Sequence, residues 1–122
     1  YQQDYGELVK KRSREWKGFA DKSELTYFPS VSPGWDATPR AAVKGYYMTE
    51  RYPWWPVVIN EDPALFSDFL GRAISYTKKS NNPQLSFIAS WNEWSEGHYL
   101  EPDKRFGTAW LEAVRKEKLD AL

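Results

Sequence analysis

The sequence predicts an α/β fold built from parallel βα units. Helical segments alternate along the chain with short, almost wholly apolar runs, which is typical of strands buried on both faces of a parallel sheet. Polar and aromatic clusters follow two of those runs directly, and parallel sheets bind ligands at the carboxyl ends of their strands. The length of 122 residues corresponds to one modest domain.

The first expected helix covers residues 4–19. Its apolar side chains recur at the spacing of one helical face, and lysines and arginines fall on the other face. The apolar residues are Tyr5, Leu8, Val9, Trp16 and Phe19. A strand is expected next, within 25–31, because aromatic and β-branched residues are concentrated there. Pro29 cannot donate to a ladder, so the strand should end near Phe28.

A loop is expected over 32–40, which contains two prolines and a glycine, and an irregular stretch should continue from it to Asn60. The second helix is expected to start with Asp62 as its N-cap. Pro63 then occupies the first helical position, where a missing N–H costs nothing. Apolar residues at helical spacing continue to Thr77.

A second buried strand is expected over 85–90, after a break at 78–83 that contains lysines and a proline. The polar segment 91–103 follows it as a loop, and a last helix should begin near Gly107. We interpret the whole chain, 1–122, as a single partial domain.

Composition argues against several classes of protein. Acidic and basic side chains number 17 each, and this balance disfavours electrostatic binding of nucleic acid. No apolar run approaches the roughly 20 residues that span a bilayer, and the first residues lack a signal-peptide core. The absence of cysteine excludes disulfides and thiolate zinc sites. The chain starts at Tyr1 and its one methionine is Met48, so we expect it to belong to a longer protein. The compartment stays open.

The segment SWNEWSEGHYLEP, residues 90–102, carries the densest chemistry of the chain. Glu93 and Glu96 are three residues apart directly behind an apolar run, where a tight turn can direct both carboxylates into one pocket. Such a pair suits glycosidic chemistry, in which one carboxylic acid protonates the leaving oxygen and the other supports the attacking group. The alternative is a solvated loop whose glutamates pair with Lys104 or Arg105.

Aromatic residues make up 17% of the chain and suit stacking on sugar rings, or an aromatic core or oligomer interface. The candidate binding residues within the motif are Trp91, Asn92, Trp94, His98 and Tyr99. Three further candidates follow the first strand: Trp35, Asp36 and Arg40. Asp36 suits sugar hydroxyls and Arg40 an acidic sugar, but a salt bridge between the two is the alternative. No cofactor is expected. The Glu-x-x-His spacing of di-iron sites is absent, so no metal is expected either.

The segments ASWNEWSEGHYLEP and FGTAWLEAV resemble the hallmark of glycoside hydrolase family 99 and of the related WbsX-type proteins. The latter are often described as glycosyltransferases of bacterial polysaccharide clusters, so the resemblance favours the bacterial cytoplasm as the compartment. YFPSVSPGWDATPR and VVINEDPALFSDFLGRA resemble the WbsX pattern in the same order, so the resemblance runs from Leu25 to about Val114. It implies a (β/α)8 TIM-type barrel. Because such a barrel needs about 250 residues, the chain would form the C-terminal part of one.

The resemblance also implies roles for three glutamates. Glu93 would be the base that assists attack by the sugar 2-hydroxyl, Glu96 the general acid and then the base, and Glu101 a substrate or structural contact. Members of glycoside hydrolase family 99 are endo-acting α-mannosidases or mannanases, and their motif has Gly-Thr-Gln where this chain reads Gly97-His98-Tyr99. This difference places the chain nearer the WbsX group.

The expected function is retaining endo-glycosidase action on a polysaccharide. The alternatives are a glycosyltransferase of bacterial polysaccharide (O-antigen) synthesis and a non-catalytic carbohydrate-binding element. The chain alone should be inactive, and it can self-associate through unpaired strand edges.

Overall fold

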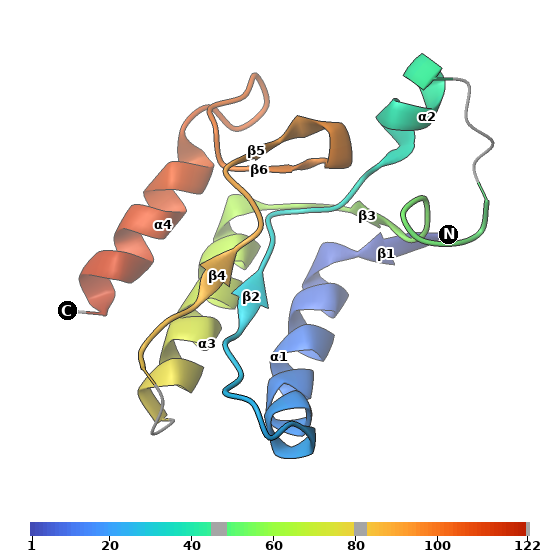
Figure 1. Cartoon of the computed structure of the whole chain (residues 1–122). Helices are drawn as coiled ribbons and strands as arrows, with labels where there is room; N and C mark the ends of the chain where they lie inside the picture. The colour runs from blue at the N-terminus through green and yellow to red at the C-terminus, as the bar shows by residue number, and fades with distance from the viewer. Residues whose placement is uncertain (45–48, 80–82, 122) are drawn as a thin grey trace.

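The structure, a computed structural model, describes residues 1–44, 49–79 and 83–121. Helices and short strands alternate along the chain, and the predicted α/β class with parallel βα units is confirmed (Figure 1). The elements are β1 (Gln2–Asp4), α1 (Tyr5–Lys22), β2 (Ser30–Val31), α2 (Thr38–Lys44), β3 (Val57–Ile59), α3 (Pro63–Lys79), β4 (Phe87–Ile88), β5 (Asn92–Glu93), the 3-10 turn η1 (Trp94–Glu96), β6 (His98–Tyr99) and α4 (Ala109–Asp120).

The described strands form three separate pairs. β1 lies parallel to β3, with Gln2 opposite Val57. β2 lies parallel to β4, with Ser30 opposite Phe87. β5 and β6 form an antiparallel hairpin that contains the motif. Helices connect the parallel strands, because a parallel pair needs a crossover to return the chain to the same end.

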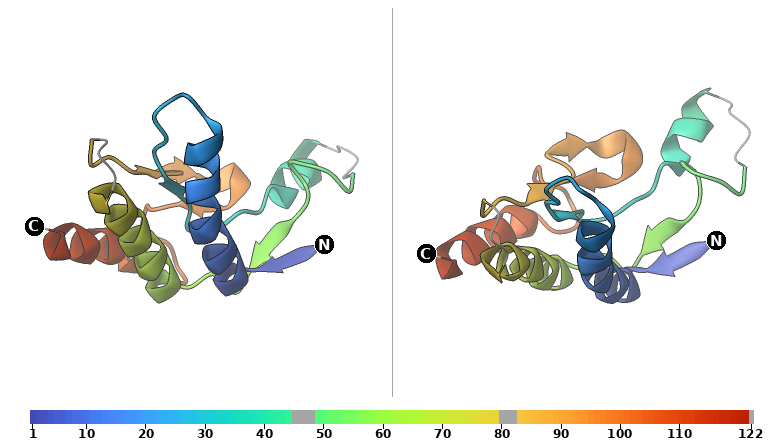
Figure 2. Two further views of the ribbon diagram at one scale, coloured as in Figure 1. Left: turned by 90° about the horizontal axis from the view of Figure 1, so that it is seen from below. Right: turned by 60° about the horizontal axis from the view of Figure 1, so that its bottom comes forward.

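Helices α1, α3 and α4 form a layer behind β2 and β4, with α3 in the middle (Figures 1 and 2). Aromatic rings fill this layer: Trp16 stacks on Phe69 with centroids 5.7 Å apart, and Phe66 meets Trp110 edge-on at 5.7 Å. Burial of each such side chain contributes about 1.5–3 kcal/mol, so this aromatic cluster accounts for much of the stability of the layer. The core consists of Tyr5, Val9, Trp16, Val31, Val58, Phe66, Phe69, Leu70, Ala73, Leu100, Trp110 and Ala113.

The predicted helices are confirmed, with small shifts at their ends. Asp4 caps α1 by accepting a hydrogen bond from the Glu7 amide at 3.1 Å. The helix continues past the predicted end to Lys22, because a single Gly18 only weakens a helix. Pro63 is the first residue of α3, as predicted. In the described part of the chain no helix is long and apolar enough to cross a membrane.

The prediction that the first strand ends near Phe28 is wrong, because the paired residues are Ser30 and Val31. Pro29 precedes the ladder instead of ending it. Its carbonyl accepts a hydrogen bond from the Phe87 amide at 2.9 Å, and this bond does not need the N–H that proline lacks. The second predicted strand, 85–90, is shorter in the structure, where only the two residues of β4, Phe87–Ile88, are paired.

The prediction of one irregular stretch from 41 to Asn60 is also wrong. Helix α2 begins at Thr38, inside the expected loop 32–40, and has Pro39 in its first turn, where proline is tolerated. β3 forms just before Asn60. Residues 45–48 of the expected stretch, and residues 80–82 of the expected break, lie outside the described residues.

Candidate active site

The motif segment folds into a tight hairpin directly after β4. β5 enters the hairpin, η1 turns the chain, and β6 leaves it. Gly97 allows the turn because its φ of +66° is a conformation that other residues rarely adopt. The Leu100 amide donates to the Trp91 carbonyl at 2.9 Å and closes the base of the hairpin.

The hairpin docks against the loop that follows β2, so the structure brings the two predicted loops together. The Asp36 amide donates to the Glu96 carbonyl at 2.8 Å. Glycines permit the close approach: a Cβ atom on Gly34 would lie 2.9 Å from the Gly97 carbonyl oxygen. Both loops follow parallel neighbouring strands at their carboxyl ends, which is where ligand sites form in such folds.

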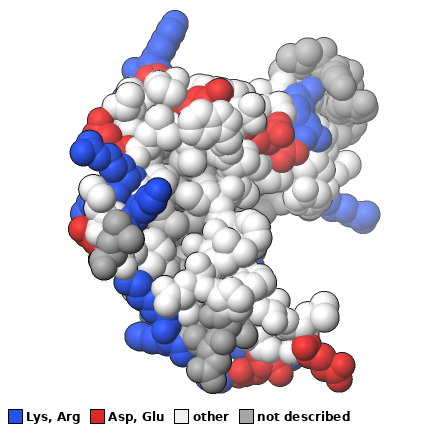
Figure 3. All heavy atoms as spheres, turned by 60° about the vertical axis from the view of Figure 1, so that its left-hand side comes forward, with Lys and Arg blue, Asp and Glu red and all other residues white. Residues whose placement is uncertain are grey.

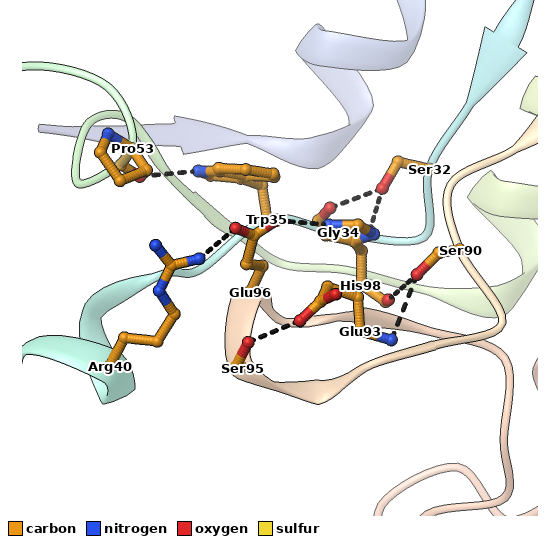
Figure 4. A network of polar contacts seen from close by, with 10 residues as sticks. All are labelled: Ser32, Gly34, Trp35, Arg40, Pro53, Ser90, Glu93, Ser95, Glu96 and His98. Atoms are coloured by element: carbon orange, nitrogen blue, oxygen red, sulfur yellow. Dashed lines mark hydrogen bonds and ion pairs between the residues drawn. The ribbon is translucent and has the colours of Figure 1, made fainter. Parts of the chain in front are cut away.

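Glu96 is the centre of this contact (Figure 4). Its Oε1 accepts a hydrogen bond from the Arg40 guanidinium of α2, in an ion pair. Its Oε2 lies 3.1 Å from Nε2 of His98. The Glu96 side chain is only 20% exposed, so its carboxylate is largely removed from water and held from two sides. Lys104 and Arg105 do not hold it, because Arg105 lies 3.7 Å from Glu61 and no contact of Lys104 with the motif glutamates is present in the described residues.

Glu93 has different surroundings. Its side chain is exposed to solvent, and its Oε1 accepts a hydrogen bond from the Ser95 hydroxyl at 2.5 Å. The Glu93 amide donates to the Ser90 hydroxyl at 3.2 Å. Although the two glutamates are only three residues apart, Glu93 is exposed to solvent and Glu96 is mostly covered by other side chains.

His98 is buried beside Glu96, and its ring lies on the indole of Trp35 with centroids 5.3 Å apart and planes 15° apart. Trp35 also stacks with Tyr52 at 5.5 Å, and its Nε1 donates to the Pro53 carbonyl at 3.0 Å. Arg40 lies over the ring of Trp54 at 5.9 Å. Sequence reasoning did not predict roles for Tyr52 and Pro53, since nothing local connects these two residues with the motif.

The other half of the motif carries an aromatic platform. Trp94 stacks on Tyr99 with centroids 3.7 Å apart, and its Nε1 donates to Glu101 at 2.6 Å. The Glu101 carboxylate therefore has a hydrogen-bond donor within the motif itself. Trp94 is 45% exposed and Trp91 54% exposed, and Asn92 is exposed as well. These side chains are available to a ligand at the surface of the hairpin.

The platform ends in a polar contact between Tyr99 and Asp103. Burial, and then the hydrogen bond to Asp103, raise the pKa of Tyr99 to about 12. Burial acts to raise the pKa of Asp103, but hydrogen bonds from the Phe106 amide, Tyr99 and Trp110 hold it below its usual value. Asp103 is therefore a carboxylate that orients the hydroxyl of Tyr99.

Asp36 has a local partner rather than Arg40. Its Oδ1 accepts hydrogen bonds from the Thr38 amide at 2.9 Å and the Thr38 hydroxyl at 2.7 Å, at the start of α2. The alternative of a salt bridge between Asp36 and Arg40 is wrong, since Arg40 pairs with Glu96. In the described residues, no three histidine or acidic side chains lie close enough together to hold a metal ion.

Acidic side chains beside exposed aromatic rings, at the carboxyl ends of parallel strands, are typical of carbohydrate-active enzymes. Comparison with known proteins gives the family. The chain belongs to the family described as Glycosyltransferase WbsX, whose model matches residues 2–114.

Two curated relatives, each called Uncharacterized protein WxcX, come from two strains of Xanthomonas campestris pv. campestris. Each is 38% identical to this chain over 96 residues, which cover 76% of the chain. The chain spans 12% of the length of these relatives. No solved structure matches it.

Proposed function

We propose that this chain is the C-terminal part of a barrel enzyme that forms glycosidic bonds during the synthesis of a bacterial polysaccharide. The observation that carries the proposal is Glu96, a sequestered carboxylate held by Arg40 and His98 at the carboxyl ends of parallel strands, in a chain of the WbsX family. The family description favours glycosyl transfer, the alternative expected from the sequence, over retaining endo-glycosidase action.

The incomplete sheet supports the barrel part of the proposal. β2 and β4 form only a two-stranded sheet, which is marginal by itself, with helices packed behind it. Phe87 of β4 is 52% exposed although strands of such folds are normally covered on both faces. The space-filling view shows a hollow on one side of the molecule with few charged side chains on its wall (Figure 3). Further βα units would cover these surfaces, and self-association through the open strand edges is the other way to do so.

The two glutamates suit transfer chemistry for different reasons. The Glu96 carboxylate is mostly shielded from water and is held by Arg40 and His98, so it can interact strongly with charge that develops at the anomeric carbon. Glu93 is exposed and in reach of solvent or of an acceptor hydroxyl. Trp91 and Trp94 offer exposed faces for sugar rings, and we propose that they bind the polysaccharide together with Asn92 and Tyr99.

Hydrolysis is the second candidate, because the same pair of glutamates can act on water instead of an acceptor sugar. A binding element without catalysis is the third, and the exposed tryptophans of the hairpin are the observation in its favour.

The test is genetic complementation in the source organism. A strain that lacks the gene for the full-length protein receives the wild type, Glu93→Gln, Glu96→Gln or the control Glu24→Gln, an exposed glutamate outside the site. Glycosyl transfer predicts that the strain loses or shortens its polysaccharide. The wild type and Glu24→Gln should restore it, and Glu96→Gln should not.

Two other outcomes identify the other candidates. Intact or lengthened polysaccharide in the deletion strain, with oligosaccharides released only by the wild type, indicates hydrolysis. Full restoration by both Glu93→Gln and Glu96→Gln rejects catalysis by this pair. We also expect the 122-residue chain alone to show no turnover, and a robust rate would contradict the barrel proposal.

A further inference from the structure

His98 is the single histidine of the sequence, and its neighbours fix the orientation of its ring. The residue is 7% exposed, and its imidazole stacks on Trp35. Trp35 is itself fixed by its hydrogen bond to the Pro53 carbonyl and by the ring of Tyr52. Because these neighbours come from outside the motif, the orientation of His98 does not depend on the hairpin alone.

The two ring nitrogens of His98 have unequal surroundings. Nε2 lies 3.1 Å from Oε2 of Glu96. Nδ1 is buried and has no hydrogen-bond partner among the described residues. A proton on Nδ1 would leave a buried N–H donor without an acceptor, which proteins avoid more strictly than an unpaired lone pair. The neutral ring with its proton on Nε2 avoids that cost, and Nε2–H then donates to Glu96.

Glu96 therefore accepts on both carboxylate oxygens. The Arg40 guanidinium, which has no acceptor capacity, donates to Oε1, and His98 donates to Oε2. The Glu96 carbonyl in turn accepts from the Asp36 amide at 2.8 Å, which holds the main chain of the same residue. In this arrangement neither oxygen of Glu96 carries a proton. Glu93, by contrast, has only the Ser95 hydroxyl as a side-chain donor in the described residues.

We propose that His98 is a positioning residue whose neutral imidazole, protonated on Nε2, orients the Glu96 carboxylate together with Arg40. Glu96 then begins the reaction as a base or as a stabiliser of positive charge, because a carboxylate with two donors can accept a proton but cannot supply one. This order is the reverse of the initial acid role that the family resemblance implies for Glu96. The catalytic meaning rests on the proposed function, whereas the protonation state of His98 does not.

The protonation state can be measured in the full-length protein by nitrogen NMR with labelled histidine. The two ring signals that belong to His98 are those that disappear in His98→Leu. At neutral pH we expect one signal of the proton-bearing type from Nε2 and one of the lone-pair type from Nδ1. Glu96→Gln is the matched variant. Arg40 takes the amide oxygen of Gln, so the amide NH2 faces Nε2 and should move the ring proton toward Nδ1. Glu93→Gln should leave both signals in place.

A proton on Nδ1 in the wild type, a doubly protonated ring at neutral pH, or equal shifts in the two Gln variants would overturn the proposal.

A second arm measures the turnover of the sugar substrate by the full-length protein. Loss of orientation should lower kcat on the order of 100-fold in His98→Leu with KM nearly unchanged, and His98→Gln, which keeps an N–H donor, should recover part of it. A rise in KM with normal kcat would instead assign His98 to substrate contact. If the wild type shows no turnover, the proposed function fails while the NMR arm still decides the role of His98.

Discussion

Replacing Gly97 by alanine tests how the motif hairpin is held against the loop after β2. At its φ of +66° an alanine is strained by roughly 1–2 kcal/mol. The new Cβ would also lie 2.9 Å from the Asp36 nitrogen and 3.1 Å from the Asp36 Cβ. Neither atom is the end of a flexible side chain, so the two loops must separate, and overpacking of this kind costs about 1–3 kcal/mol. We expect a total loss of about 2–5 kcal/mol.

Two other glycines separate the contributions in urea unfolding measurements. Gly107 has a φ of +57° with no atom within 4 Å of an added Cβ, so Gly107→Ala should show the conformational strain alone, about 1–2 kcal/mol. Gly18 lies inside α1 with open space around it, so Gly18→Ala should stabilise the chain by about 0.5–1 kcal/mol. The midpoints should shift with little change in slope.

The reasoning is refuted if Gly97→Ala and Gly107→Ala cost the same, because the close approach of the hairpin to Asp36 would then add nothing. The nitrogen NMR signals of the His98 ring provide a second measurement on the same variants. Separation of the loops also separates Glu96 from Arg40, so Gly97→Ala should disturb the ring signals of His98, and Gly107→Ala should not.

Three more predictions concern stability and ionisation. Phe66→Ala should cost about 3–5 kcal/mol in urea unfolding because it empties the centre of the helix layer, and Leu25→Ala, at a residue 80% exposed, should stay within about 0.5 kcal/mol of the wild type. In Asp103→Asn the free energy of unfolding should decrease less, as pH falls, than it does in the wild type. A carboxyl whose native pKa is depressed contributes stability above its unfolded pKa and loses it as pH falls through the native value, so an equal loss below about pH 5 in wild type and variant would contradict the prediction. The pKa of Tyr99 is raised to about 12 in the folded chain. Its contribution to the free energy of unfolding is therefore complete below the pKa of tyrosine in the unfolded chain, and it is lost as pH rises through the pKa of the folded chain. Tyr99→Phe should remove a tyrosinate absorbance step near pH 12, and removal of a step near pH 10 would show that Tyr99 is not perturbed.

The helices were predictable because their determinants are local. Apolar residues at helical spacing and Pro63 at a first helical position are enough to place α3 before any partner is known. The strands were harder, because each contains only two or three paired residues and its partner is distant in sequence. Ser30 pairs with Phe87, and nothing near Pro29 shows that its carbonyl begins a ladder instead of ending one. β3 was missed for the same reason, since its partner is β1 near the start of the chain.

By itself, the sequence determined that Glu93, Glu96 and His98 lie in one short turn behind an apolar strand, because chain connectivity sets that spacing. Only the tertiary structure decided which of these three side chains is shielded from solvent. Arg40 reaches Glu96 from 56 residues away, and Trp35 covers His98 from the loop after β2. The two glutamates are alike in sequence and differ in environment, because environment depends on which distant loops pack against the hairpin and not on the order of residues within it.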